Sequence, residues 1–333
     1  MLIAVFAVGA ASVVWYEQGD DKKPVATTEV KKKTTPQDPL TIAAIRARSY
    51  PGSAITVERD IGVMNGYHEQ IISYKSDGLI IRALRDTPTG SPPAGGWPVI
   101  ILDHGYINPA QYQTAGSDYR SYIATFTGAG YMVVKPDFRG HGTSEGVAEG
   151  GHFSPVYTYD QLNLLASLKQ DSTVNAARIG QFGHSMGGHV ALRTTVVSKD
   201  IKATVLMAPV VGSFNDLFYS WPHSPAPNDQ PRAITTGKRE ELVAKYGDPK
   251  QNPDFWNSVS AINYVEAVTG PIQINHDADD STVPKLFSDH LADALTKAHK
   301  SVEYYVYPGD DHQFSRSRSL LLERALAFYK IHL

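Results

Sequence analysis

The sequence predicts an α/β fold with a mostly parallel central sheet and helices on both faces. From residue 97 onward, short apolar runs alternate with segments of helical periodicity, a pattern typical of a parallel sheet covered by helices. One apolar run, at 179–182, leads through residues 183–187 into a helix-like segment. Residues 183–187 form a Gly-x-Ser-x-Gly turn in a strand-turn-helix context. The 333 residues could hold one large domain of this class or two small ones.

Antiparallel strands are expected ahead of the parallel sheet. A short helix over 41–48 precedes alternating runs at 54–61, 70–74 and 79–85. Residues 76–78 (Ser-Asp-Gly) join the last two runs, and this composition is typical of a hairpin turn. A loop rich in proline and glycine then follows, at 88–96.

The parallel part should contain six strands and five helices in alternation. The apolar run at 98–102 is continuous, as expected of a strand buried on both faces. The expected strands are 98–102, 131–134, 179–182, 201–207, 272–275 and 302–307. The expected helices are 110–128, 159–170, 186–197, 286–298 and 317–332.

An insertion separates two of these strands. The interval 209–270 is rich in proline, asparagine and aromatic residues, and so long a connection inside one domain is usually functional. We expect residues 212–265, called the insertion below, to form a small lid. Its aromatic residues Phe218, Trp221 and Trp256 are the candidates for contact with substrate.

The N-terminus differs from the rest of the chain. Residues 2–14 are apolar and uncharged, and two aromatic residues follow, which suit a membrane interface. The run is short for a full span and has no basic flank or clear cleavage site. Signal peptide and uncleaved anchor both stay open, with the anchor slightly favoured. A buried core segment is the weaker alternative, because a polar stretch follows directly. We expect a signal or anchor over 1–16, a flexible linker over 17–39, one α/β domain over 40–333, and an exported protein.

Composition excludes several classes of function. The net charge is −3, which gives none of the basic character expected of a nucleic-acid-binding domain. The chain has no cysteine, so disulfides, thiolate metal sites and a cysteine nucleophile are excluded. Its 42% hydrophobic and 20% charged residues are ordinary for a soluble globular domain.

Ser185 is the candidate nucleophile. A serine at a sharp strand-to-helix turn projects its hydroxyl to where a base can reach it. Glycine at the flanking positions suits such a crowded turn, and the following helix presents free N–H groups to an oxyanion. A chance match to so short a motif is the alternative. The predicted strand before the turn and the predicted helix after it make us favour a nucleophile elbow, the strand-turn-helix arrangement that presents a catalytic serine.

The oxyanion donors are expected from two turns. Asp103-His104-Gly105-Tyr106 follows a predicted strand, and such a turn can aim the Tyr106 N–H at the site, together with the Met186 N–H. An ordinary strand-to-helix turn is the alternative. Asp137 and Arg139, after the next strand, are expected to hold nearby loops by hydrogen bonds.

The acid and the base are expected after the last two strands. Asp277, Asp279 and Asp280 follow one strand end, where a carboxylate could orient an imidazole. A metal-binding loop is a weaker interpretation, because no EF-hand spacing is present. His312 follows the final strand, so serine, acid and histidine occur in the order typical of α/β-hydrolases.

From about residue 74 to its C-terminus, the chain resembles the α/β-hydrolase superfamily and, within it, prolyl-oligopeptidase-like serine hydrolases and esterases. The matching segments are 103–106, 137–146, 183–188, 246–249, 283–284 and 307–309, together with Asp280 and His312. In the family the acid lies three residues before a valine, which implies Asp280 through Val283. Asp277 stands where glycine is usual. We expect no β-propeller of the kind that restricts prolyl oligopeptidases to short peptides, so their specificity is not carried over.

Together these observations predict a serine hydrolase with the triad Ser185, Asp280 and His312. We expect carboxylic esters as substrates, apolar or aryl because of the aromatic insertion, with no cofactor and no metal. A peptidase acting on short peptides is the alternative, because the same triad serves both reactions. A non-enzymatic binding module on the same fold is a third reading, and the presence of all three triad residue types argues against it. Possible partners are a small-molecule substrate and, through the N-terminus, a membrane; the oligomeric state is left open.

Overall fold

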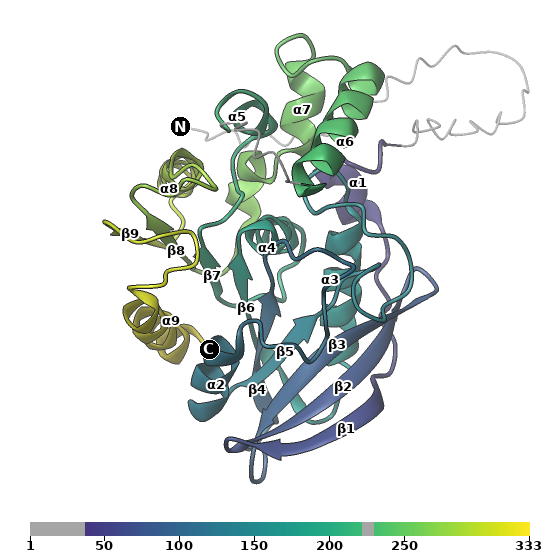
Figure 1. Cartoon of the computed structure of the whole chain (residues 1–333), viewed down its shortest axis with the longest axis vertical. Helices are drawn as coiled ribbons and strands as arrows, with labels where there is room; N and C mark the ends of the chain where they lie inside the picture. Colours follow the sequence, from purple (N-terminus) through teal and green to yellow (C-terminus); the bar gives the residue numbers. More distant parts are fainter. Residues whose placement is uncertain (1–36, 222–229) are drawn as a thin grey trace, which may run out of the picture. The chain divides into compact units, whose positions relative to one another are not determined.

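A single sheet runs through the part of the chain that the structure describes (Figure 1). The computed structural model describes residues 37–221 and 230–333, and within them nine strands are ordered β1-β2-β3-β5-β4-β6-β7-β8-β9. Strands β4 to β9 pair in parallel, whereas β1, β2 and β3 are antiparallel to their neighbours. The strands are β1 Thr56–Met64, β2 Tyr67–Ser76, β3 Leu79–Pro88, β4 Trp97–Asp103, β5 Met132–Pro136, β6 Val174–His184, β7 Thr204–Met207, β8 Ile272–Asp277 and β9 Val302–Tyr307. The predicted fold class, a mostly parallel sheet with N-terminal antiparallel strands, is confirmed.

Local sequence explains both halves of the sheet. All seven residues of β4 are buried, as a strand covered on both faces requires. Ser76 pairs with Leu79, so β2 and β3 are joined by a two-residue turn. Asp77 and Gly78 in that turn have positive φ angles of 54° and 83°, which the tight hairpin turns require and which Asp-Gly adopts readily.

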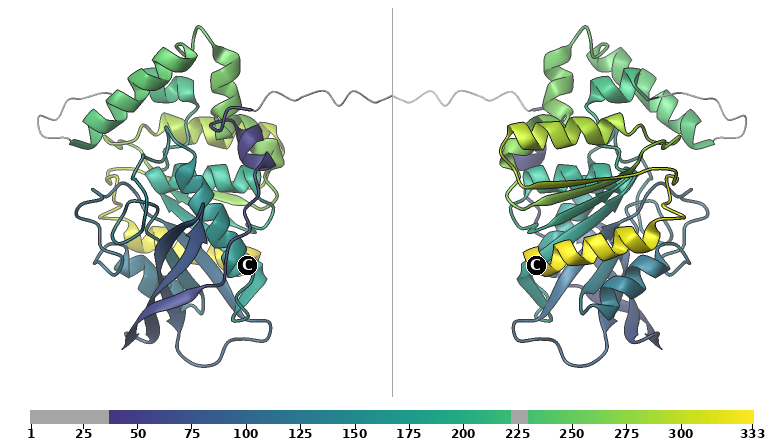
Figure 2. Two further views of the ribbon diagram at one scale, coloured as in Figure 1. Left: turned by 90° about the vertical axis from the view of Figure 1, so that its right-hand side faces the viewer. Right: turned by 90° about the vertical axis from the view of Figure 1, so that its left-hand side faces the viewer.

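Helices cover both faces of the sheet, and Figure 2 shows the two helical layers with the strands between them. Helices α2 and α9 pack on one face around Phe126, Phe182 and Phe328. Helices α1, α3, α4 and α8 pack on the other. Their bounds are α1 Ile42–Ala47, α2 Arg120–Gly128, α3 Val156–Leu168, α4 Met186–Val197, α8 Leu286–Lys297 and α9 Arg318–His332.

One expected helix begins later than the sequence suggested. Helicity was expected from residue 110, but residues 108–119 form successive turns and α2 starts at Arg120. Tyr119 has a left-handed backbone with φ 63°, which an α-helix cannot contain. The segment 108–119 is therefore a loop at the carboxyl end of β4.

The insertion between β7 and β8 is helical. It contains α5 Phe214–Tyr219, α6 Gln230–Tyr246, α7 Pro253–Val259 and most of the 3₁₀ helix η1 Ala261–Ala267, with α5, α6 and α7 grouped beyond α1 and α8 at the top of both figures. A capping box between Ser213 and Asp216 starts α5. The two ends of the insertion are tied together, since the Phe214 N–H donates to Ser260 Oγ at 3.0 Å.

The first residues that the structure describes pack against the rest of the domain. Asp38 Oδ2 accepts a hydrogen bond of 2.6 Å from the Tyr246 hydroxyl of α6, and Leu40 is buried in the adjoining core. The expected signal or anchor over 1–16 lies outside the described residues, as does most of the expected linker. Among the residues that are described, no helix has both the length and the apolar composition needed to cross a membrane.

Candidate active site

Ser185 occupies a strained turn between β6 and α4. Its backbone has φ 53° and ψ −117°, a conformation that a non-glycine residue adopts at a cost of about 1–3 kcal/mol. The flanking glycines are required by close packing. A Cβ at Gly187 would lie 2.0 Å from the carbonyl oxygen of Asp103, and one at Gly183 would lie 2.8 Å from Ala191 Cβ. The turn therefore holds the Ser185 side chain at the carboxyl end of the sheet.

The structure brings together the predicted nucleophile, base and acid. His312 lies in the loop after β9, and its Nε2 is 2.9 Å from Ser185 Oγ. Its Nδ1 is 2.7 Å from Asp280 Oδ2. The His312 side chain is 12% exposed and that of Asp280 is fully buried, so the acid is shielded while the base stays within reach of solvent. A hydroxyl, an imidazole and a carboxylate are thus joined in one hydrogen-bonded series.

Asp280 is held as an ionised acceptor. Its Oδ1 accepts the backbone N–H groups of Thr282 and Val283 at 2.8 and 3.0 Å. Burial acts to raise the pKa of Asp280, but the hydrogen bonds from His276 and His312 outweigh it and hold the pKa well below its ordinary value. The carboxylate therefore stays charged when its neighbour His312 gains a proton.

The two competing aspartates do not contact the imidazole. Asp277 is buried and accepts the backbone N–H groups of Asp279 and Asp310 at 3.1 and 3.0 Å. This second bond ties the end of β8 to the loop that carries His312. Asp279 is exposed. Of the three candidates, Asp280 is the one placed against His312.

The turns that carry the two expected oxyanion donors lie next to Ser185. A Cβ at Gly105 would lie 3.3 Å from Ser185 Cβ, so the turn after β4 passes directly beside the serine, and Tyr106 is the next residue. Met186 is the first residue of α4, where backbone N–H groups have no partner within the helix. Both turns end at the same edge of the sheet, as in other open α/β sheets with binding sites.

Three further residues complete the surroundings, and sequence reasoning did not identify them. His276 Nε2 donates to the Val283 carbonyl at 3.0 Å and lies 3.4 Å from Asp280 Oδ2. His184, directly before the serine, contacts both Tyr119 and the backbone of His312. Position gave a signal for two of them: His276 stands four residues before Asp280, and His184 is the first variable residue of the Gly-x-Ser-x-Gly turn.

The three candidate aromatic residues lie in different surroundings. Phe218 and Trp256 are 3% and 2% exposed and pack against each other inside the insertion, with ring centroids 5.0 Å apart. Trp221 is half-buried, and its Nε1 donates to the Thr282 carbonyl at 2.7 Å. Its ring also lies 5.5 Å from that of His152. Of the three, Trp221 joins the insertion to the loop that carries Asp280.

Asp137 and Arg139 hold loops, as their positions suggested. Asp137 accepts hydrogen bonds from the Tyr112 and Thr114 hydroxyls at 3.0 and 2.6 Å. Arg139 forms an ion pair with the buried Asp160 at 2.6 Å. Neither contact involves the serine, the histidine or the acid of the site.

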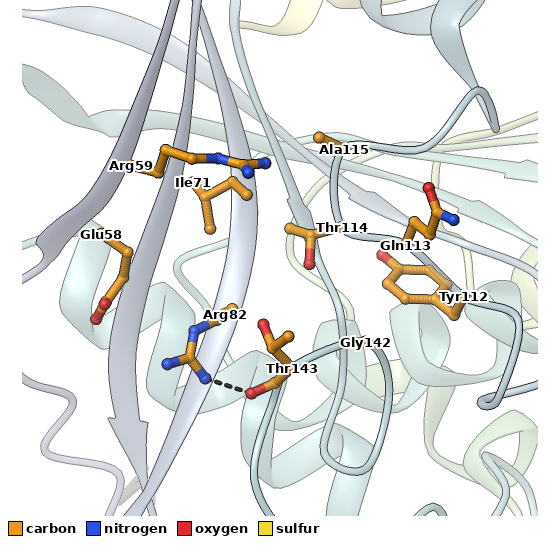
Figure 3. A pocket seen from close by; sticks show the side chains of 10 residues that line it. All are labelled: Glu58, Arg59, Ile71, Arg82, Tyr112, Gln113, Thr114, Ala115, Gly142 and Thr143. Carbon is orange, nitrogen blue, oxygen red and sulfur yellow. Dashed lines mark hydrogen bonds between the residues drawn. The ribbon is translucent and has the colours of Figure 1, made fainter.

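A separate cavity of about 500 Å³ lies between the first strands and the loop 112–115 (Figure 3). In it, Arg82 donates to the Thr143 carbonyl. The cavity is lined by Glu58, Arg59, Ile71, Arg82, Tyr112, Gln113, Thr114, Ala115, Gly142 and Thr143. None of the triad candidates is among these residues. Within the part of the chain that the structure describes, no cluster of three or more acidic or histidine side chains is placed to hold a metal ion.

The sheet topology, the strained serine turn and the hydrogen-bonded series of side chains define an α/β-hydrolase. The chain belongs to the prolyl oligopeptidase family, whose model (Peptidase_S9) matches residues 117–333, more than half of the sequence. It is therefore a serine hydrolase of this family, as the sequence motifs had suggested.

Individual relatives differ in how much of their length the chain covers. It is 23% identical to the uncharacterized peptidase YtmA of Bacillus subtilis (strain 168), over 77% of this chain and 90% of that protein. The acetyl xylan esterase of Paenibacillus sp. R4 is 18% identical with a TM-score of 0.66, over 88% of this chain and 92% of the esterase. Dipeptidyl peptidase 4 of Porphyromonas gingivalis is 21% identical with a TM-score of 0.63, over 80% of this chain but only 36% of that peptidase. At these identities the two solved structures show the fold alone.

Proposed function

We propose that the chain hydrolyses carboxylic esters through an acyl-enzyme formed on Ser185. The observation that carries the proposal is the series Ser185 Oγ, His312 and Asp280, with separations of 2.9 and 2.7 Å. Its geometry meets the requirements of a nucleophile, a base and an orienting carboxylate.

The proposed reaction has two halves. Ser185 Oγ attacks the ester carbonyl carbon as His312 Nε2 takes the hydroxyl proton, and the Tyr106 and Met186 N–H groups stabilise the carbonyl oxygen as it gains negative charge. The carbon–oxygen bond to the alcohol then breaks, and His312 returns the proton to the leaving oxygen. In the second half, water gives a proton to His312 and attacks the acyl carbon. The bond from that carbon to Ser185 Oγ then breaks, His312 returns the proton to Oγ, and the acid is released. No step requires a cofactor.

One contact of the insertion favours an ester over a peptide. Trp221 stands beside the acid loop and offers an aromatic wall to an apolar or aryl group. We infer that Trp221, rather than the buried Phe218 and Trp256, contacts the substrate.

A peptidase acting on short peptides is the second candidate. The family match and the similarity to YtmA over 90% of its length favour it, and the triad chemistry is the same for both bond types. Amides differ because the leaving amine must be protonated more fully as the bond breaks. The two functions are therefore separated by the leaving group that the enzyme tolerates.

The deciding experiment compares p-nitrophenyl esters of increasing acyl length with aminoacyl and prolyl p-nitroanilides. We expect kcat/KM to be higher for the esters, with the anilides near background. Higher kcat/KM for a prolyl or aminoacyl anilide would establish the peptidase instead. Ser185→Ala should lower turnover by a factor on the order of 10⁴ to 10⁶, while Ser198→Ala at the other end of α4 should retain it. Near-normal turnover in Ser185→Ala would exclude the serine mechanism.

We also propose that the enzyme acts outside the cytoplasm. The support is the apolar run 2–14 and the polar stretch that follows it. Fractionation of cells that produce the full chain should place activity in the membrane if residues 1–16 are an uncleaved anchor. Activity in the medium or periplasm would indicate a cleaved signal, and activity confined to the cytosol would contradict export.

A further inference from the structure

A hydrogen-bonded connection crosses the site behind Ser185. The backbone N–H of Gly105 donates to the Tyr119 hydroxyl oxygen at 2.7 Å. The same oxygen is 2.6 Å from His184 Nδ1, and His184 Nε2 is 3.1 Å from the carbonyl oxygen of His312. These contacts join the loop after β4, the end of β6 and the loop after β9.

The direction of each hydrogen bond follows from the chemistry of its ends. A carbonyl oxygen only accepts, so His184 Nε2 must carry the proton that it donates to His312. In a neutral imidazole Nδ1 is then an acceptor, and the Tyr119 hydroxyl must donate to it. Burial, followed by the proximity of His312, lowers the pKa of His184 to about 3, which agrees with the neutral ring. One tautomer and one hydroxyl orientation therefore satisfy all three contacts.

The backbone at Tyr119 and at Gly105 has features that bring these hydrogen-bonding groups together. Tyr119 is a large residue with φ 63°, and such outliers persist only where the surroundings enforce them. At Gly105, a Cβ would lie 3.0 Å from His184 Nδ1 and 3.2 Å from the Tyr119 hydroxyl oxygen. Larger residues at position 105 would therefore crowd the contact that links the oxyanion turn to the two side chains.

The last of these hydrogen bonds is made to the backbone of His312, whose side chain contacts Ser185 Oγ. His312 must keep its Nε2 within hydrogen-bond reach of the serine and its Nδ1 against Asp280. Asp280 fixes the ring from one side, and the His184 N–H fixes the backbone carbonyl of the same residue. The two imidazole rings lie close together, with centroids 5.0 Å apart.

We propose that Tyr119 and His184 are positioning residues that hold His312 in line with Ser185 and couple its loop to the oxyanion turn at Gly105. This proposal rests on the proposed function, because it concerns how the base meets the nucleophile. Neither side chain is required to touch the substrate. Their loss should therefore lower kcat and leave KM largely unchanged.

Tyr119→Phe is the direct test, since it removes the hydroxyl and keeps the ring. Misplacement of a reacting group can cost roughly 100-fold, so we expect kcat for a p-nitrophenyl ester to fall about 10- to 100-fold. Tyr122→Phe is the matched control: its ring lies 5.7 Å from that of Tyr119, and its hydroxyl contacts Met207 Sδ. An unchanged kcat in Tyr119→Phe, or an equal loss in the control, would overturn the proposal.

Variants of His184 test whether the two residues act as one unit. His184→Gln offers an amide N–H that can donate to the His312 carbonyl, whereas His184→Leu cannot, so Gln should retain more activity. Tyr119→Phe should cost little further once His184→Leu is present, because residues in one network are not additive. Fully additive losses, or equal losses for Gln and Leu, would show that no such connection operates. Circular dichroism and Tm identify any variant that fails to fold, and Tyr119→Phe remains the deciding variant in that case.

Labelling by a fluorophosphonate separates failure of this proposal from failure of the proposed function. The probe reacts with an activated serine whatever the natural substrate is. We expect Tyr119→Phe to be labelled at Ser185 about 10-fold or more slowly than the wild type. Equal labelling rates in the two would overturn the positioning role alone, while a wild type that is not labelled would overturn both.

Discussion

Replacement of Asp280 by asparagine tests the most demanding feature of the site. Asparagine keeps a carbonyl oxygen that can accept the N–H groups of Thr282 and Val283, so the loop should keep its shape. Its amide N–H₂, however, would face His312 Nδ1 and donate to it. The imidazole proton would then move to Nε2, where it blocks acceptance of the Ser185 proton.

The expected cost is large because the wrong tautomer is inactive. A carboxylate-to-amide change at such a position lowers turnover by roughly 10⁴, which corresponds to about 5.4 kcal/mol in the activation free energy. The loss should fall on kcat, because Asp280 is buried behind His312 and does not face the substrate. Turnover of a p-nitrophenyl ester measures it, with circular dichroism to confirm folding.

The neighbouring aspartates supply matched controls. Asp279→Asn should leave turnover close to that of the wild type, because its side chain is exposed. Asp277→Asn loses one of the two acceptor oxygens that now serve the N–H groups of Asp279 and Asp310. It should still cost far less than Asp280→Asn, because Asp277 does not contact His312. If Asp279→Asn were inactive and Asp280→Asn active, the placement of the acid would be wrong by one residue.

Three further predictions concern the insertion, the N-terminus and pH. Trp221→Ala should raise KM for aryl esters about 3- to 10-fold, with Trp221→Phe closer to wild type; equal effects on aryl and short alkyl esters would contradict an aromatic wall. Deletion of residues 1–36 should leave kcat unchanged, while deletion to residue 39 should also lower Tm by removing Asp38, the acceptor for Tyr246; aggregation of the shorter deletion would show that the N-terminus belongs to the core. Asp86 of β3 is buried and pairs with Glu69 of β2. Burial, reinforced by the charge of Glu69, raises the pKa of Asp86 from 3.8. The folded protein therefore keeps a proton that the unfolded chain releases, and it loses stability as pH rises above that value. The Tm of Asp86→Asn minus that of the wild type should therefore increase between about pH 5 and pH 8. A Tm difference that does not change with pH would contradict a buried, protonated Asp86.

The fold was predictable because its signals are local. Continuous apolar runs and helical periodicity mark most elements of the parallel sheet within a few residues. The helix expected from residue 110 is absent in its first half, where Tyr119 has a left-handed backbone and its hydroxyl contacts His184, 65 positions away. Hydrophobic periodicity along the sequence gives no information about a contact between such distant residues.

The sequence motifs predicted Ser185, Asp280 and His312, but not the residues that surround them. The turn around Ser185 and the order of acid and histidine identify positions that the structure brings together. Tyr119 and His184 contact each other and residues of other loops, and His276 contacts Val283 and Asp280 in the segment after its own strand. These contacts depend on how the chain folds around the site. Similarly, an aromatic-rich insertion did not show that Phe218 and Trp256 fill its interior while Trp221 faces the acid loop.

The way the insertion joins the sheet has a consequence for how such an enzyme can change its substrates. The Val210 N–H donates to the Ser185 carbonyl oxygen at 3.0 Å, so the stem before the insertion is fastened to the nucleophile's own backbone. Strands β7 and β8, which the insertion connects, are paired neighbours. Material between two adjacent, fixed ends can be lengthened or exchanged at a cost that grows slowly with loop length. We therefore expect that a chimera which keeps residues up to 211 can take a different insertion, and with it a different preference for substrates, while Ser185 stays in place.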